Sequence, residues 1–265
     1  MTHRYDLSEI REFWTKQALE FGDSHAASWS DRRVMEMEIR EILQRLDDGD
    51  SVLDVGCANG WSTLNFAVQK RLDLVGLDYI PEMIHQAKER LARAEEHIKG
   101  SVAFDVGDIT ALTQASGAFD KLIVIRVVIN LADWARQCLA LRECARVLKP
   151  GGLLLLSEAT VQGWQRLNAL RAEWLLPPIP MPPFNLYLDE DAVVSEVGAD
   201  LELVDLVNFA STYFVGTRVL KPLIAQVLQK GIDYTNPDME WNRWFSQLPA
   251  AGDYGTQKLF VFRRR

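Results

Sequence analysis

The sequence has few of the residues that mark metal sites or disulfide frameworks. Its 265 residues include only three cysteines and four histidines. Cys57, Cys138 and Cys144 are spaced like neither a zinc site nor a set of paired half-cystines. We therefore expect three reduced thiols and no bound metal.

Positive charge and long apolar runs are also scarce. Lys and Arg total 29 against 37 Asp and Glu, which gives a formal net charge of -8 at pH 7. An acidic chain repels a polyphosphate backbone, so nucleic acid is a poor candidate partner. No uncharged run approaches the roughly 20 residues of a membrane span, and the opening MTHRYDLSEIREFW lacks the apolar core of a secretion signal. We expect a cytoplasmic protein without membrane contact.

From residue 51 onward, the chain alternates short apolar runs with helical patterns. This alternation is typical of βαβ units that build a mostly parallel sheet. The pattern predicts helices over 61–70, 81–99 and 134–148, and the turn at 149–152 ends the last of them. We therefore expect an α/β fold with helices on both faces of a seven-stranded sheet. The expected strands are 51–55, 72–77, 101–106, 119–125, 152–157, 201–207 and 256–262.

Three segments stand outside this alternation, namely 1–50, 159–188 and 209–255. We expect a single domain over 1–265, in which 51–158 forms the core. The first segment is expected to be a helical lid, and the other two are expected to shape the site for a second ligand. Five prolines in the middle segment exclude a continuous helix and predict a stiff loop over the sheet edge.

The strongest local signal is the turn between the first expected strand and the following helix. After Asp54, small residues stand at alternate positions, Gly56, Ala58 and Gly60, so backbone can approach a ligand closely. A dinucleotide-binding turn would need a glycine where Trp61 stands, and the Gly-Lys-Ser/Thr of a triphosphate loop is absent. A nicotinamide dehydrogenase is therefore disfavoured.

Polar residues also stand at the ends of the next three strands. Asp78 and Tyr79 follow the second strand, Asp108 and Ile109 follow the third, and Arg126 ends the fourth. Each has an ordinary interpretation when taken alone, such as a helix cap at Asp78 or a turn former at Asp108. Their joint order at consecutive strand ends is what predicts a single ligand site.

In this order the sequence resembles the class I, Rossmann-like S-adenosylmethionine-dependent methyltransferases that act on small molecules. The resemblance runs through most of residues 40–160, and it departs from the family's motif at Ala58, where the family has glycine. That departure is small, because a methyl group adds little bulk. The cofactor-binding residues that the resemblance implies are Asp54, Gly56, Ala58, Gly60, Asp78, Tyr79, Asp108, Ile109 and Arg126.

The resemblance also implies a role for the strand-end residues. Asp78 would accept the ribose hydroxyls and Tyr79 would lie along the adenine. Asp108 would accept from the adenine amine, and Ile109 would cover the ring. Arg126 needs a partner at the cofactor edge, and a ligand carboxylate, an internal acid or solvent could each provide one.

No short motif identifies the acceptor. His25 lies in a loop that the resemblance folds over the cofactor, where it is either a general base or an ordinary surface residue. Aromatic and amide side chains in the extra segments suit a flat or ring-shaped acceptor, including a carbohydrate, although they could equally pack the segments against the core. The acceptor-site candidates are Trp29, Asn185, Tyr187 and Tyr213.

The expected activity is methyl transfer from S-adenosylmethionine to an oxygen of a sugar or natural-product intermediate, with S-adenosylhomocysteine as product. The fourth strand is followed by Arg-Val-Val-Ile where amino-methyltransferases of nucleobases carry Asn-Pro-Pro-Tyr. The alternative is a non-catalytic or differently reacting protein of the same fold that binds S-adenosylmethionine. Methyl incorporation from labelled cofactor separates the two.

Overall fold

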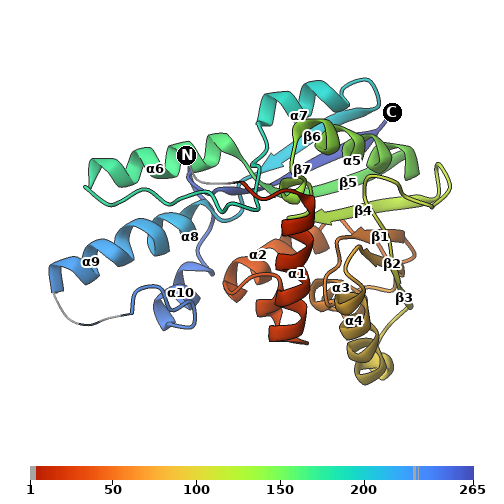
Figure 1. Ribbon diagram of the computed structural model, residues 1–265, viewed down its shortest axis with the longest axis horizontal. Helices are drawn as coiled ribbons and strands as arrows, with labels where there is room; N and C mark the ends of the chain where they lie inside the picture. Colours follow the sequence, from red (N-terminus) through yellow and green to blue (C-terminus); the bar gives the residue numbers. More distant parts are fainter. Residues whose placement is uncertain (1–3, 229–230, 232) are drawn as a thin grey trace.

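The computed structural model describes residues 4–228, 231 and 233–265. Its centre is one sheet with these strands: β1 (Ser51–Val55), β2 (Asp73–Asp78), β3 (Ser101–Val106), β4 (Phe119–Ile125), β5 (Leu148–Ala159), β6 (Leu201–Val207) and β7 (Gln257–Arg264). The order across the sheet is β3-β2-β1-β4-β5-β7-β6 (Figure 1). Neighbours run parallel, except that β7 is antiparallel to both β5 and β6. The predicted α/β fold with seven mostly parallel strands is confirmed.

The central strands are apolar along their length because helices cover both of their faces. Leu122, Ile123 and Val124 of β4 are fully buried. Alternate residues point to opposite faces, so Ile123 belongs to one core cluster, and Leu122 and Val124 belong to the other. The register places Val55 beside Leu77 and also beside Val124, which brings the carboxyl ends of β1, β2 and β4 together at one edge.

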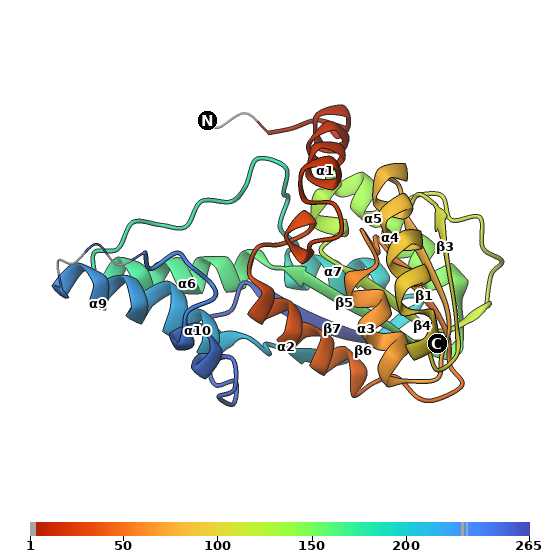
Figure 2. The same cartoon turned by 90° about the horizontal axis from the view of Figure 1, so that it is seen from below.

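Helices are divided between the two faces of the sheet (Figures 1 and 2). The Ile123 face is covered by α2 (Arg32–Leu43) and α3 (Trp61–Gln69), and the Val124 face by α5 (Trp134–Val147) and α7 (Glu190–Val197). Beside α3, α4 (Pro81–Ala94) packs on β3. The helix predicted over 81–99 therefore ends earlier, at Ala94, and one 3-10 turn, η2 (Glu95–His97), leads towards β3.

The N-terminal segment forms α1 (Leu7–Phe21) and the 3-10 turn η1 (His25–Ala27) before α2. The side chain of Asp6 accepts from the N–H of Glu9, and the Glu9 side chain accepts in return from the N–H of Asp6, so α1 starts with a capping box. Packed on α4 and η1, α1 stands above the carboxyl edge of the sheet (Figure 2).

A helical extension projects to one side of the sheet (Figure 1). The segment after β6 starts it with α8 (Ser211–Val215), and a π-helical stretch, η4 (Gly216–Leu220), joins α8 to α9 (Lys221–Leu228). The same segment also contains α10 (Glu240–Phe245), and α6 (Val161–Glu173) runs along the extension from the end of β5. Within the described residues, no helix has both the length and the apolar character that crossing a bilayer requires.

The proline-rich loop after α6 lies over the carboxyl edge of the sheet. It returns along α6 and crosses the carboxyl ends of β4 and β5, where Leu186 N–H donates to Ile129 O at 2.7 Å and Leu188 N–H to Ala159 O at 3.0 Å. Its Pro183 carbonyl accepts from Tyr5 N–H at 3.1 Å. Backbone bonds to the centre of the sheet and to the N-terminal segment thus fix the path of this loop.

Candidate functional site

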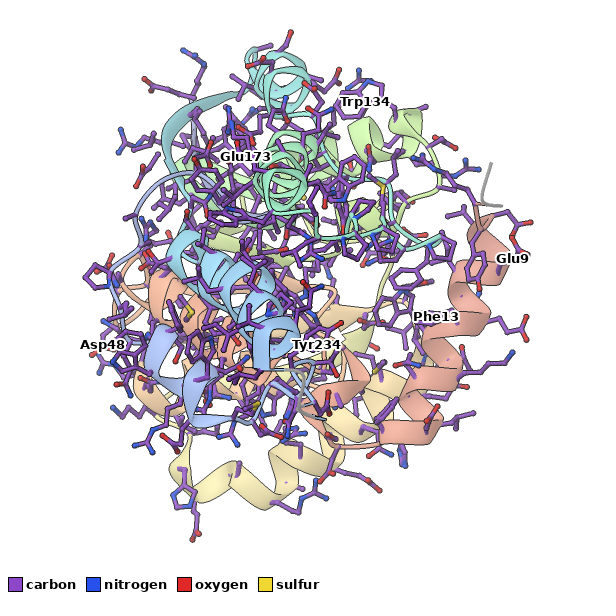
Figure 3. All side chains as sticks on the ribbon, turned by 90° about the vertical axis from the view of Figure 1, so that its left-hand side faces the viewer. Glu9, Phe13, Asp48, Trp134, Glu173 and Tyr234 are labelled. Carbon is purple, nitrogen blue, oxygen red and sulfur yellow. The ribbon has the colours of Figure 1, made fainter. Side chains whose placement is uncertain are left out.

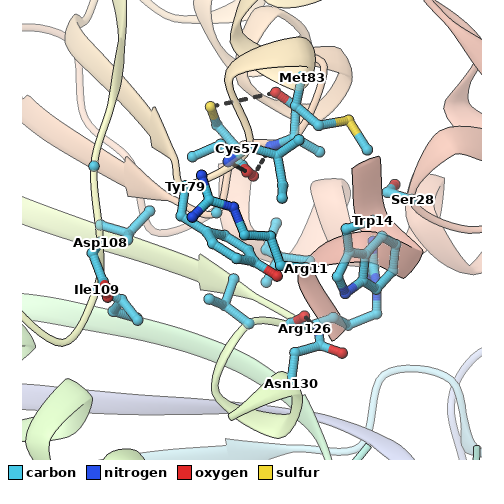
Figure 4. Close-up of a pocket in the computed structure, with 18 of the residues that line it drawn as sticks. Arg11, Trp14, Ser28, Cys57, Tyr79, Met83, Asp108, Ile109, Arg126 and Asn130 are labelled. Carbon is cyan, nitrogen blue, oxygen red and sulfur yellow. Dashed lines mark hydrogen bonds between the residues drawn. The ribbon is translucent and has the colours of Figure 1, made fainter. Parts of the chain in front are cut away.

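A cavity of about 420 Å³ opens at the carboxyl ends of β1 to β4, beneath α1 (Figure 4). This volume lies in the range of pockets that hold one drug-sized ligand. Every residue that the sequence predicts to bind the cofactor lines this cavity, except Gly60. The structure thus brings the strand-end residues together, as their order along the chain predicts.

The glycine turn after β1 forms one wall. Gly56 has a φ of +76°, and a Cβ there would stand 2.1 Å from Val127 Cγ2, so no side chain fits. Ala58 also has a left-handed φ, of 47°. The sequence shows only the volume of its methyl group, but this backbone conformation is also unfavourable for a residue with a Cβ. Gly60 is the N-cap of α3, and a Cβ there would lie 2.8 Å from Phe104 Cζ. Gly60 therefore lets α3 pack on β3 and does not face the cavity.

Two buried aspartates hold this turn against the sheet. Asp54 Oδ2 accepts from the Thr63 hydroxyl at 2.6 Å, and burial raises the Asp54 pKa to about 7. Asp78 Oδ2 accepts from Ala58 N–H, and its Oδ1 from Ile80 N–H, both at 2.9 Å. Burial raises the Asp78 pKa to about 6, because these backbone bonds offset only part of the desolvation. Each Asp78 oxygen keeps a lone pair for a further donor.

The residues after β2 and β3 form the opposite wall. The Tyr79 ring lies inside the cavity (Figure 4), and burial, followed by the Asp78 charge, raises the pKa of its hydroxyl. Asp108 Oδ1 accepts from the N–H and the hydroxyl of Thr110, at 2.8 and 2.7 Å. Asp108 is thus both a turn former and part of the cavity, and Ile109 beside it is buried.

Arg126, at the end of β4, forms the floor next to the glycine turn. Its φ is 55°, unusual for a residue with a side chain. The partner that the sequence left open is Glu38 of α2, whose Oε2 accepts from Arg126 Nη1. The guanidinium carbon lies 4.8 Å from the centre of the Trp29 ring. Glu38 is 1% exposed and also accepts from Ser157 Oγ and Gln257 Nε2.

Glu158, near the end of β5, holds the turn that follows β4. Its Oε1 accepts from Val127 N–H at 2.8 Å and from Val128 N–H at 2.7 Å. Burial raises the pKa of Glu158 to about 8. Sequence reasoning missed both Glu38 and Glu158. Each could have been recognised as an acidic residue at a position expected to be buried. Glu38 lies on the apolar side of α2, and Glu158 lies near the end of the apolar strand β5.

Comparison with known proteins identifies the domain that holds this cavity. Residues 46–176 match the family model described as a methyltransferase domain. Residues 46–176 are therefore similar to methyltransferase domains. Methyltransferase GfsG of Streptomyces halstedii is 31% identical over 125 residues, which are 46% of this chain and 43% of that protein.

Other similar proteins agree with this assignment. The 27-O-demethylrifamycin SV methyltransferase of Amycolatopsis mediterranei is 26% identical over 145 residues, which are 51% of this chain and 50% of that protein. The chain thus spans at most half of the length of these two curated relatives. Magnesium protoporphyrin IX methyltransferase of Synechocystis PCC 6803 has the same fold, with a TM-score of 0.64 at 14% identity over 98% of this chain and 100% of that chain.

The wall that faces the sheet is supplied by α1. Leu7, Arg11 and Trp14 recur at helical spacing on one face of α1, and all three line the cavity. Figure 4 shows Arg11 extending beside Tyr79, and Figure 3 shows Phe13 pointing inwards. The sequence predicted a lid over 1–50 without identifying these residues, because the helical pattern does not show which face meets the cavity.

An aromatic cluster attaches α1 to the proline-rich loop. The Phe13 ring stacks on Phe184 with centroids 4.3 Å apart, and Trp14 meets the edge of the same ring at 5.7 Å. Because Trp14 also lines the cavity, Phe184 contacts a wall residue without entering the cavity itself.

The residues predicted to contact the acceptor do not line this cavity. The ring nitrogen Nδ1 of His25 lies 3.1 Å from Trp29 O, and Trp29 lies under Arg126. Tyr187 meets Trp164 edge to face at 6.4 Å, near Asn185. Tyr213 is fully buried among core residues. Trp29, Tyr187 and Tyr213 pack against the core clusters, which is the alternative that the sequence left open for these aromatic residues.

Proposed function

We propose that this protein transfers the methyl group of S-adenosylmethionine to an oxygen atom of a small-molecule acceptor, such as a sugar or another natural-product intermediate. The observation that carries the proposal is a single cavity in which the backbone of a glycine turn faces the carboxylates of Asp78 and Asp108. The relative from Amycolatopsis mediterranei is named for an O-demethylated acceptor, which favours oxygen.

The residues present fit this cofactor. Gly56 leaves backbone exposed to the amino-acid end, since any side chain there would collide with Val127. Asp78 offers lone pairs to the ribose hydroxyls, and Tyr79 and Ile109 offer apolar surface to the adenine. The lining residues that the cofactor would leave free for the acceptor include Trp14, Ser28, Asn130 and Leu131. They are added to the acceptor-site candidates predicted from the sequence.

The protein contributes alignment and exclusion of water rather than covalent chemistry. A bound sulfonium supplies an activated methyl group, so the main requirement is a fixed line of approach for the acceptor oxygen. The turn after β4 supplies rigidity there, because Glu158 holds the N–H groups of Val127 and Val128. On the other side, Trp14 of α1 covers the cavity and keeps water out.

Calorimetric titration with S-adenosylhomocysteine tests the cofactor site. We expect micromolar binding that weakens at least tenfold in Asp78→Ala, because a charge-assisted hydrogen bond contributes about 1.5–3 kcal/mol. Asp73→Ala, at the other end of β2, removes a carboxylate from the same strand and should bind like the unmodified protein. No heat with either S-adenosylhomocysteine or S-adenosylmethionine would contradict the proposal.

A second measurement separates the enzyme from the binding protein of the same fold. Labelled S-adenosylmethionine is incubated with a library of hydroxylated natural products and sugars, and methyl incorporation is counted. Label in an ether or ester product supports the proposed oxygen acceptor, and label in an amine product contradicts it. Tight cofactor binding with no incorporation into any library member favours the non-catalytic alternative.

A further inference from the structure

Asp31 is one of the points at which the C-terminal extension contacts the N-terminal segment. It is 3% exposed and lies directly before α2. Its Oδ1 accepts from the Tyr213 hydroxyl at 2.8 Å, and its Oδ2 accepts from Arg218 Nη2 at 2.6 Å. Both donors belong to the extension. A buried carboxylate of the N-terminal segment is therefore held by two groups from a segment almost 190 residues further along the chain.

The local structure of the extension presents these donors to Asp31. Arg218 lies within the π-helical stretch η4, and such stretches are rare and often mark functional positions. At its start, Gly216 allows α10 to approach, because a Cβ there would stand 2.2 Å from Phe245 Cδ1. Trp241 Nε1 donates to the Gly216 carbonyl at 3.0 Å and attaches α10 to the stretch.

A chain of buried polar groups fixes the Tyr213 hydroxyl. Asn242 Nδ2 donates to it at 2.8 Å, while Asn242 Oδ1 accepts from Lys221 Nζ at 2.6 Å. Lys221 Nζ also donates to Asn236 O at 2.7 Å. A buried network whose members have partners is rigid, since moving one member leaves the others unpaired. The Tyr213 hydroxyl is thus a fixed point rather than a mobile surface group.

On its other side, Asp31 adjoins the two residues that hold Arg126. Trp29, two positions before Asp31, lies under the Arg126 guanidinium. Glu38, in the helix that Asp31 caps through Val34 N–H, binds the same guanidinium. A displacement of Asp31 would therefore move the stacking partner and the charged partner of Arg126 together, and Arg126 lines the cavity.

We propose that Asp31, Tyr213 and Arg218 are positioning residues of the cofactor site. Through Asp31, the extension fixes Trp29 and Glu38, and these hold the guanidinium of Arg126, a residue that lines the cavity. The inference rests on the proposed function, because it assigns a purpose to groups around the same cavity. It gives Tyr213 an indirect role in place of the acceptor contact expected from the sequence.

The test measures affinity for S-adenosylhomocysteine in variants remote from the cavity. Arg218→Gln and Tyr213→Phe should each weaken binding about two- to thirtyfold, the range of coupling through packed networks. Arg218→Lys keeps a cation near Asp31 and should recover part of the loss. Tyr213→Phe removes one hydroxyl and leaves the Arg218 ion pair intact, so it remains informative if Arg218→Gln fails to fold.

Val193→Ala is the matched control for lost stability. Val193 is fully buried in α7 on the opposite face of the sheet. It should lower the thermal midpoint as the positioning variants do and leave the affinity unchanged. Unchanged affinity in Arg218→Gln and Tyr213→Phe would overturn the proposal, as would equal weakening in Val193→Ala. If the unmodified protein binds no S-adenosylhomocysteine, the proposed function itself fails, which is a separate outcome.

A double-mutant cycle shows whether the effect passes through Arg126. In an Arg126→Gln background, Arg218→Gln should cause little further loss, because the group that it positions is gone. If Arg126→Gln leaves no measurable binding, Trp29→Leu serves as the background, since it removes the stacking partner alone. Equal losses with and without the background change would mean that Arg218 acts by another route, and the proposal would be rejected.

Discussion

Replacing Glu158 by glutamine should make the protein more stable at alkaline pH. The side chain is completely buried, and its Oε1 accepts the N–H groups of Val127 and Val128. Glutamine keeps a carbonyl oxygen in the same place and has nearly the same shape. The substitution therefore retains the two hydrogen bonds and removes only the capacity to ionise.

The size of the effect follows from the pKa of Glu158, which burial raises from 4.5 to about 8. Below pH 4.5 the folded and unfolded chains both hold the proton, so the substitution changes little. Between pH 4.5 and 8 the unfolded chain loses the proton first, and the free energy of unfolding falls by about 1.4 kcal/mol per pH unit. The glutamine variant escapes this loss, which reaches about 3 kcal/mol at pH 7 and about 5 kcal/mol above pH 8.

Urea unfolding at intervals from pH 4.5 to pH 9 measures this difference directly. Glu158→Gln should match the unmodified protein at the acid end and exceed it increasingly up to pH 8. Glu173→Gln, an exposed position at the end of α6, controls for the loss of a negative charge from the chain. Two stability curves that stay parallel across this range would refute the argument, because Glu158 would then ionise alike in the folded and unfolded chains.

Three further changes probe the walls of the cavity. Gly56→Ala should abolish S-adenosylhomocysteine binding in calorimetry, because its Cβ would stand 2.1 Å from Val127 Cγ2, whereas Gly117→Ala, at a φ of +67° with open space around it, should bind normally. Asp108→Ala should weaken binding about tenfold through loss of a charge-assisted bond, and affinity unchanged from that of the unmodified protein would contradict the adenine role. Phe184→Ala removes a ring stacked 4.3 Å from Phe13, so limited proteolysis should cleave near α1 faster, with the rate for Leu175→Ala as reference.

Strands and strand-end residues could be predicted from the sequence because their signals are local. A buried parallel strand appears as an apolar run, and the residue that ends it occupies a fixed place at the carboxyl edge. Asp78 thus ends β2, and Asp108 follows β3 by two positions. The predicted strand bounds hold within one or two residues, except that β5 begins at Leu148 rather than at residue 152.

Partnerships between distant residues could not be predicted in the same way. Arg126 and Glu38 are 88 positions apart, and nothing in the apolar pattern of α2 indicates which strand end its buried acid meets. Likewise, a tyrosine at position 213 is compatible with contact to a ligand and with a hydrogen bond to a buried aspartate, so the sequence alone does not identify its partner. Composition suggested a ligand, but the neighbours supplied by the fold make it a buried hydrogen-bonding group.

The residues that line the cavity come from different parts of the chain. The strand ends and the glycine turn supply the residues proposed for the cofactor, whereas Trp14 and Ser28 come from the N-terminal segment. Among the described residues, none from 159–188 or 209–255 lines the cavity. These segments reach it through intermediaries, Phe184 against Trp14 and the extension against Asp31. We therefore infer that the acceptor contacts Trp14 and Ser28 of the N-terminal segment together with Asn130 and Leu131 after β4. The two later segments determine where the N-terminal residues stand.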